Sequence, residues 1–168
     1  SGSISRVGAR IYSYEANRSQ DEGSIVGSLQ QAIPVRNWIA DLSARKEWIQ
    51  GYSVPFCPSV GAEGQLSKQV SAKLHFSRNF KAPTLNDRFW KPGGNENLKP
   101  ETSWNYEAGI NWQSATSAKF SNAEIGLTAY YSVIKNLILW SPMPENASVW
   151  SPGNIQEVIS KGIEINSK

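Results

Sequence analysis

The stretch 102–113 constrains the fold most, because its side chains alternate in character at almost every position. The residues at its even positions are mostly apolar: Thr102, Trp104, Tyr106, Ala108, Ile110 and Trp112. The residues at its odd positions are polar or small: Ser103, Asn105, Glu107, Gly109, Asn111 and Gln113. Successive side chains of a β-strand point to opposite faces, so this pattern predicts a strand with one apolar and one polar face. Aromatic rings near both ends, with aliphatic side chains between them, are typical of strands that cross a bilayer.

The same period of two recurs along the chain and predicts about eight strands. The expected ranges are 5–15, 24–32, 36–49, 55–66, 69–80, 102–112, 119–140 and 154–166. A break is expected at Pro34, because proline has no N–H to donate within a sheet. A bulge or bend is expected near Lys135 and Asn136, because the alternation is lost after them. We therefore predict an all-β fold, an antiparallel meander of about eight strands.

The segments between these strands alternate in length. The long segments are 16–23, 50–54, 79–101 and 141–153, and the short ones lie near Pro34, Ser67 and Ser114. Bacterial outer-membrane barrels have long extracellular loops and short periplasmic turns. The alternation therefore predicts that the four long segments lie on the extracellular side.

Composition excludes several classes of function. Charged residues make up 18% of the chain, below the roughly 25% of soluble domains. The net charge of +3 is small and dispersed, so a nucleic-acid groove is not expected. The single cysteine, Cys57, excludes an internal disulfide and a multi-cysteine metal site. The single histidine, His75, has no serine–aspartate or cysteine pattern around it, so we expect a hydrogen-bonded structural residue and no catalytic or metal site.

Two motifs stand at the two ends of the segment 79–101 and carry a family resemblance. They read FKAPT at residues 80–84 and NLKPE at residues 97–101, and the pattern WNYEAG follows at residues 104–109. A further short motif, KGIE, stands at residues 161–164. Together they resemble the barrel of TonB-dependent outer-membrane receptors. The resemblance implies that residues 1–168 form one partial domain of a transmembrane β-barrel, with the plug, the coupling box and the terminal strands of the parent receptor outside this chain.

The resemblance also implies a function. Receptors of this family take up a scarce, bulky ligand across the outer membrane of Gram-negative bacteria, and ferric siderophores, haem and cobalamin are the candidate ligands. The implied partners are outer-membrane lipid, the plug and the remaining barrel, the small-molecule ligand, and TonB indirectly through the coupling box. Neither enzymatic activity nor a cofactor is expected.

Candidate ligand-binding residues are the aromatic and polar positions of the long segments. They are Asn86, Arg88, Phe89, Trp90, Lys91, Trp140 and Trp150. Aromatic side chains supply contact area, and basic groups suit anionic siderophores or phosphate-bearing ligands. The alternative role of these residues is packing within the loops.

Two other readings of the strands stay open at the sequence level. A soluble β-rich binding module with an aromatic-lined surface would turn the apolar face inwards, so that Leu42, Trp104 and Ala108 would lie in a dry centre. A chain of eight strands could also close on itself as a small barrel. Tryptophans at strand ends favour the membrane barrel over the soluble module. If the sheet stays open, its unpaired edges predict self-association of the isolated chain.

Overall fold

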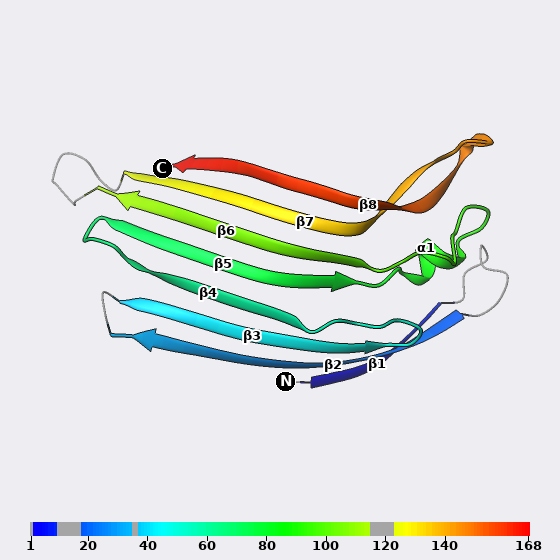
Figure 1. Cartoon of the computed structure of the whole chain (residues 1–168), viewed down its shortest axis with the longest axis horizontal. Helices are drawn as coiled ribbons and strands as arrows, with labels where there is room; N and C mark the ends of the chain where they lie inside the picture. The colour runs from blue at the N-terminus through cyan, green and yellow to red at the C-terminus, as the bar shows by residue number, and fades with distance from the viewer. Residues whose placement is uncertain (1, 10–17, 35–36, 115–122) are drawn as a thin grey trace.

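The computed structural model covers residues 1–168 and describes residues 2–9, 18–34, 37–114 and 123–168, the first range by its backbone alone. Its elements are β1 (Gly2–Ala9), β2 (Arg18–Ile33), β3 (Trp38–Ile49), β4 (Cys57–Gln65), β5 (Val70–Lys81), α1 (Leu85–Phe89), β6 (Glu101–Gln113), β7 (Glu124–Met143) and β8 (Asn146–Ser167). The eight strands form one sheet in chain order (Figure 1), and the registers show that each strand is antiparallel to the next. The predicted all-β meander is therefore confirmed.

Among the described strands the sheet is open. Its order runs from β1 to β8, and these two strands are its edges. The expectation that the chain might close as a small barrel is therefore wrong for this structure. A twisted, curved sheet closes only when its first and last strands meet edge to edge, and here they lie on opposite sides of the sheet (Figure 1).

The second strand is longer than predicted. It begins at Arg18, so the expectation of a loop at 16–23 is wrong for residues 18–23, where Arg18 pairs with Ala9 and Glu22 with Ser5. Pairing uses backbone groups, so a strand can continue through polar residues that carry no apolar face. Residues 10–15 of the expected first strand and residues 119–122 of the expected seventh lie outside the described residues.

The hairpin of β7 and β8 also extends further than predicted. The expected loop at 141–153 is wrong, because Pro142 pairs with Trp150 and Trp140 pairs with Pro152 inside this ribbon. The pairing of β6 with β7 ends at Thr102 and Lys135. After Lys135, β7 pairs only with β8 among the described strands, so both strands of the ribbon have an edge without a partner strand, where a residue without an N–H is tolerated. The irregularity expected near Lys135 and Asn136 is present as a φ of 56° at Asn136. The register is the same on both sides of Asn136, so no bulge lies there, and the register shift of this pair falls between Pro142 and Met143.

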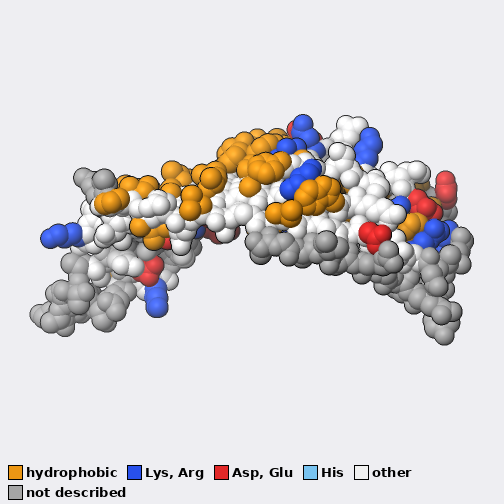
Figure 2. All heavy atoms as spheres, turned by 90° about the horizontal axis from the view of Figure 1, so that it is seen from below, with side chains coloured by type: hydrophobic (Ala, Val, Ile, Leu, Met, Phe, Trp, Pro, Cys, Tyr) orange, Lys and Arg blue, Asp and Glu red, His pale blue; other side chains and the backbone are white. Residues whose placement is uncertain are grey.

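One face of the sheet is apolar and exposed. A row across six strands joins Ala40, Ala62, Leu74, Ala108, Ala129 and Ile163. Leu42 is 52% exposed, Leu74 55% and Ile163 69%. Figure 2 shows the molecule from the side as an arch, with hydrophobic side chains gathered along its convex surface. The dry centre that a soluble module would need is not formed by Leu42, Trp104 or Ala108, all of which are exposed.

Tryptophans mark both ends of this apolar face. Trp104 and Trp112 are eight residues apart on β6, which is about 27 Å along a strand. With a strand tilt of about 40°, the two rings are about 21 Å apart along the barrel axis, close to the ~25 Å apolar band of outer-membrane barrels. Trp38 and Trp48 bracket β3 in the same way. Their spacing supports the sequence-based expectation of two aromatic girdles.

The opposite face is polar and joined by side-chain contacts between neighbouring strands. Lys73 Nζ lies 2.8 Å from Glu107 Oε1 across β5 and β6. The Nε2 atom of His75 lies 2.9 Å from Ser59 Oγ, so the expectation of a hydrogen-bonded histidine is confirmed. An exposed ion pair contributes only about 0–1 kcal/mol, so these contacts align strands more than they stabilise the fold. Among the described residues no helix is long and apolar enough to cross a bilayer.

Candidate functional site

The long connections gather at one end of the sheet. Residues 50–56, residues 82–100 with α1, and the tip of the β7–β8 hairpin all lie at the right of Figure 1. The short turn at 66–69, the end of β2 and the start of β3 lie at the other end (Figure 1). This arrangement follows from an antiparallel meander, in which every second connection returns to the same end. It brings the candidate ligand-binding residues into one region.

The helix α1 begins at a capping box. Asp87 N donates to Thr84 Oγ1 at 3.1 Å, and Thr84 N donates to Asp87 Oδ2 at 2.9 Å. Two backbone N–H groups at the start of the helix are satisfied in this way. The sequence analysis missed this helix, although Thr84 followed three residues later by Asp87 is a local signal that could have found it.

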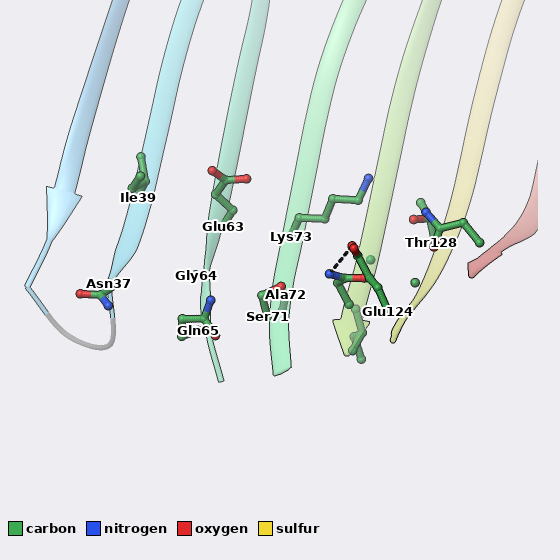
Figure 3. A pocket seen from close by; sticks show the side chains of 15 residues that line it. Asn37, Ile39, Glu63, Gly64, Gln65, Ser71, Ala72, Lys73, Glu124 and Thr128 are labelled. Carbon is green, nitrogen blue, oxygen red and sulfur yellow. Dashed lines mark hydrogen bonds between the residues drawn. The ribbon is translucent and has the colours of Figure 1, made fainter. Parts of the chain in front are cut away.

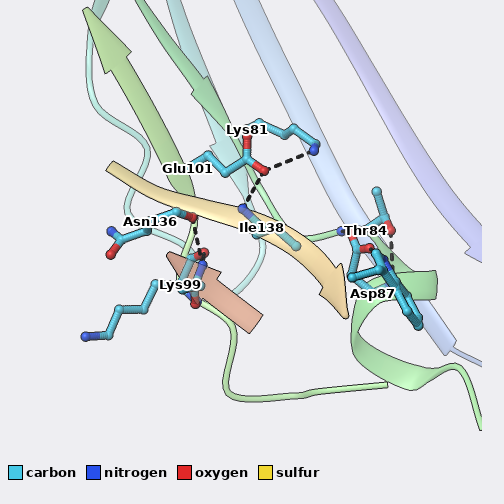
Figure 4. Close-up of polar contacts among 9 residues, drawn as sticks. Lys81, Thr84, Asp87, Lys99, Glu101, Asn136 and Ile138 are labelled. Atoms are coloured by element: carbon cyan, nitrogen blue, oxygen red, sulfur yellow. Dashed lines mark hydrogen bonds and ion pairs between the residues drawn. The ribbon is translucent and has the colours of Figure 1, made fainter. Parts of the chain in front are cut away.

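Asp87 also ties α1 to β7. The indole Nε1 of Trp140 donates to Asp87 Oδ1 at 2.9 Å, and the Thr84 hydroxyl donates to Asp87 Oδ2 at 2.7 Å (Figure 4 shows Thr84 and Asp87). Burial of the Asp87 carboxyl would raise its pKa, but the hydrogen bonds from Thr84 and Trp140 and the charge of Lys81 together lower the pKa below its usual value. Asp87 is therefore a charged anchor of the loop at neutral pH.

Further hydrogen bonds fasten the segment 82–100 to the hairpin. Asn154 accepts from Lys99 N at 2.8 Å and donates to Lys99 O at 2.9 Å and to Asn136 O at 2.8 Å. The Glu101 carboxylate accepts from Ile138 N at 2.9 Å and from Lys81 Nζ at 3.2 Å (Figure 4). Except for the ion pair of Lys81 and Glu101, these bonds join a side chain to the backbone of another element. They hold the path of the loop independently of its outermost side chains.

On its other side α1 contacts β2 and the segment 50–56. The Arg18 guanidinium carbon lies 4.2 Å from the centre of the Phe89 ring, and that of Arg88 lies 4.6 Å from it. Arg88 is also 5.6 Å from the centre of the Tyr52 ring. Burial raises the pKa of the Tyr52 phenol, while the charge of Arg88 opposes the rise. The loop that follows β5 therefore contacts β2, which lies three strands away from β5 in the order of the sheet.

The seven candidate ligand-binding residues fall into two groups. Phe89 is buried, and Arg88 and Trp140 are half-buried in the contacts just described. The exposed members are Asn86, Trp90, Lys91 and Trp150. The structure also brings Arg18 and Tyr52 to Phe89 and Arg88, and the sequence analysis missed both. No local pattern could have found them, because these contacts join elements far apart in the chain.

A hollow lies on the polar face towards the short turns. It has a volume of about 400 Å³ and is lined by residues that include Glu63, Lys73 and Thr128 (Figure 3). Asn111 Nδ2 donates to Glu124 Oε1 at 2.9 Å along its wall. None of the candidate ligand-binding residues lines it. In the described part of the chain no group of three histidine, cysteine, aspartate or glutamate residues is arranged to hold a metal ion.

The chain matches a family model described as "TonB dependent receptor-like, beta-barrel" over residues 2–168. A vitamin B12 transporter, BtuB of Photobacterium profundum, is 29% identical over 135 residues, which are 79% of this chain and 21% of the transporter. The BtuB of Vibrio vulnificus is 40% identical over 88 residues, which are 52% of this chain and 13% of that protein. The chain therefore spans about a fifth of the first relative and about an eighth of the second.

Solved structures of receptors share the fold. The siderophore receptor PirA of Pseudomonas aeruginosa superimposes with a TM-score of 0.77 at 22% identity, over 96% of this chain and 31% of PirA. A mutant of the ferric enterobactin receptor PfeA of the same organism, in complex with enterobactin, gives 0.68 at 21% identity, over 89% of this chain and 24% of PfeA. The FrpB iron transporter of Neisseria meningitidis gives 0.62 at 16% identity, over 93% and 24%. At these identities the likeness shows the fold alone.

Proposed function

Because the chain belongs to the TonB-dependent receptor β-barrel family, we propose that it forms part of the barrel wall of an outer-membrane receptor. That receptor actively takes up a bulky, scarce ligand such as a ferric siderophore, haem or cobalamin. The relatives described above are transporters or receptors for vitamin B12, siderophores or iron. These names support the class of ligand and leave its identity open.

One observation carries the proposal, namely the exposed apolar face of the sheet opposite a polar face. A wall of this kind suits hydrocarbon on one side and a hydrated interior on the other. Leu74 and His75 illustrate the contrast, since they are neighbours in β5 and point to the apolar and the polar face. In the proposed receptor the apolar face contacts outer-membrane lipid, and the polar face contacts the plug that other parts of the parent protein supply.

The transport cycle in this proposal needs parts outside residues 1–168. The parent receptor supplies the remaining barrel strands, the plug and the coupling box on which TonB acts. The small share of the relatives that this chain spans, 21% for the Photobacterium transporter, supports this division. Residues 1–168 then contribute wall and extracellular loops, and the loops are where the ligand first meets the protein.

We propose that the exposed residues of these loops contact the ligand. They are Asn86, Trp90, Lys91 and Trp150, with Arg88 beside them and with Phe89 and Trp140 as supports. Flat aromatic rings give contact area that tolerates different ligand shapes, and the cations suit an anionic ligand. The anchoring of the loop by Asp87, Asn154 and Glu101 presents these side chains on a fixed frame.

Equilibrium binding to the purified full-length receptor in detergent tests this function. Cyanocobalamin, haem and ferric enterobactin are the probes, and tryptophan fluorescence quenching is the readout. We expect one of them to bind, and the double variant Arg88→Gln with Trp90→Ala to weaken that binding about tenfold or more, because a charge-assisted bond and a stacked ring are both lost. Lys68→Gln, at an exposed turn of the opposite end, is the matched control. Unchanged affinity in the double variant dismisses these two residues, and a receptor that binds none of the probes contradicts the proposed function.

A further inference from the structure

Two arginines from distant elements share one aromatic ring. Arg18 at the start of β2 and Arg88 in α1 place their guanidinium carbons 4.2 Å and 4.6 Å from the centre of the Phe89 ring. Both side chains are half-buried and Phe89 is buried. A cation over a ring face is favourable by about 0.5–2 kcal/mol. Two cations gathered at one partly desolvated ring nevertheless repel each other, because the repulsion between like charges grows as water is excluded.

Within the part of the chain that the structure describes, neither arginine is in a direct ion pair with a carboxylate. The ion pairs among residues 18–34, 37–114 and 123–168 are Arg45–Glu47, Lys73–Glu107 and Lys81–Glu101, and none includes either arginine. Asp87 is next to Arg88 in sequence, but its two oxygens accept from Thr84 and Trp140. Nearby on β2, Glu22 accepts from the Gln20 side chain at 3.3 Å. The carboxylate oxygens of Asp87 and Glu22 thus accept from neutral donors and not from the two guanidinium groups.

Buried polar atoms of these two arginines and of Gln20 also lack hydrogen-bond partners within the described part of the chain. The Nε atoms of Arg18 and Arg88 are buried and have no hydrogen-bond partner among the described residues, and neither has the Oε1 atom of Gln20. Gln20 itself is only 4% exposed. A buried polar atom without a partner costs about 1–3 kcal/mol, more when it carries charge. Natural structures seldom keep such groups unless another molecule satisfies them.

We infer that Arg18 and Arg88, with the Tyr52 ring as a wall, form a binding site for an oxyanion between β2, α1 and the segment 50–56. The ligand class is a small-molecule group with clustered anionic oxygens, such as a phosphate, a carboxylate or the oxygens around a chelated metal. A guanidinium presents its N–H groups as a planar fork that matches two oxygens of such a group. Arg18 and Tyr52 are additions to the ligand-binding residues proposed above.

This inference deepens the proposed function and rests on it for the identity of the natural ligand. The anion site itself depends only on the contacts described here. With this site the receptor prefers ligands that present negative oxygens towards β2, and it disfavours ligands that present only neutral groups there. The site would therefore contribute to the choice among the candidate ligands, because a site built for charge rejects an uncharged analogue strongly.

Titration of the full-length receptor in detergent with inorganic phosphate tests the site. The readouts are broadening of the phosphate ³¹P resonance and the rise of the thermal unfolding midpoint with phosphate, both at constant ionic strength so that general screening cancels. We expect the unsubstituted receptor to bind phosphate and Arg18→Gln and Arg88→Gln each to weaken it about tenfold or more. Arg88→Lys keeps the charge and loses the fork, so it should weaken phosphate binding less than Arg88→Gln does. Lys68→Gln removes the same charge at the opposite end and should leave phosphate binding unchanged.

The outcomes separate a binding site from a purely structural contact. If the arginines only pack on Phe89, the variants lower the unfolding midpoint without phosphate, and the unsubstituted receptor shows no specific response to phosphate. That result overturns the inference, as does an equal response in all four variants. Binding of cyanocobalamin, haem or ferric enterobactin is measured separately. If the receptor binds one of them but not phosphate, the proposed function stands and the anion site is refuted. If it binds phosphate alone, the anion site stands and the proposed function is contradicted.

Discussion

At the scale of single residues, Asp87 shows how one side chain can organise the long loop. Its carboxylate accepts hydrogen bonds from the backbone and hydroxyl of Thr84 and from the indole of Trp140, which lies 53 residues further along the chain. One oxygen completes the cap of α1 and the other joins α1 to β7. A single charge therefore serves both the local and the long-range structure of the loop.

Replacing this carboxylate should loosen the loop without unfolding the sheet. In Asp87→Asn one acceptor oxygen becomes an NH₂ group, which cannot accept from Thr84 or Trp140. We expect a loss of about 1–3 kcal/mol in the local stability of the loop and faster hydrogen exchange of the amides at 85–95 in the intact receptor. Glu96→Gln, which changes an exposed carboxylate of the same loop, is the control. Equal exchange in both variants would show that the Asp87 contacts do not order the loop.

Acid should have the same effect as that substitution. Hydrogen bonds hold the pKa of Asp87 below its usual value of 3.8 despite burial, which acts in the opposite direction. A carboxyl with a lowered pKa in the folded state adds stability above the unfolded pKa, and this stability is lost as the pH falls through the folded value. We therefore expect protection of the loop amides to decline below about pH 4. In Asp87→Asn this part of the decline should be missing, and an identical pH profile in the variant would refute the assignment.

At the scale of elements, the loop 82–100 and the β7–β8 hairpin approach each other through their backbones. A Cβ atom at Gly93 would overlap the carbonyl oxygen of Trp150, and that oxygen cannot move without the ribbon that carries it. Asn95 donates to the carbonyl of Pro152 at 3.1 Å beside this approach. Glycine at position 93 is therefore a requirement of the contact between two elements.

Gly93→Ala should separate the loop from the hairpin. We expect faster exchange of the amides around Asn95 and weaker binding of whichever ligand the receptor takes up, because Trp90 and Trp150 lose their fixed spacing. Gly153→Ala on the same hairpin is the matched control, since a Cβ there meets no atom within 4 Å. If the two substitutions have the same effect, close approach at Gly93 is not what holds the two elements together.

The two faces of a strand should respond in opposite ways to a charge. Leu74→Arg places a guanidinium on the apolar face, where it costs about 2–4 kcal/mol near the middle of a bilayer. His75→Arg, one residue along, places the same group on the polar face, where hydration is available. We expect the first variant of the full receptor to fold into lipid vesicles with reduced stability in urea and the second to fold nearly normally. A larger loss in His75→Arg would mean that the faces are assigned the wrong way round.

At the scale of the whole molecule, the alternation of side chains predicted the meander and the character of its faces because it acts within each strand. It did not predict the starts of β2 and β8 at Arg18 and Asn146, where backbone pairing continues through polar residues. The candidate site was predictable as a region, since connections of a meander collect at two ends. Its internal contacts were not, because the bond from Trp140 to Asp87 and the approach of Arg18 to Phe89 depend on how distant elements meet.

The open sheet predicts the behaviour of the isolated chain. Strand β8 has 22 residues and lies at an edge, where it offers unpaired backbone groups beside exposed Ile159 and Ile163. Unpaired edges bind other strands, and an exposed apolar face avoids water. We expect residues 1–168 produced alone to need detergent and to form oligomers, as measured by light scattering after size-exclusion chromatography. A monodisperse monomer in plain buffer would contradict this expectation.

The side-chain hydrogen bonds that hold the long loop come from residues other than the exposed ones proposed to contact the ligand. The side chains of Asp87, Asn154 and Glu101 set the course of the chain, whereas the side chains of Asn86, Trp90 and Lys91 are exposed. The residues that hold the loop in place and the residues exposed at its surface are thus separate sets. Evolution, or a protein engineer, can exchange the second set to suit a new cargo while the first keeps the loop folded.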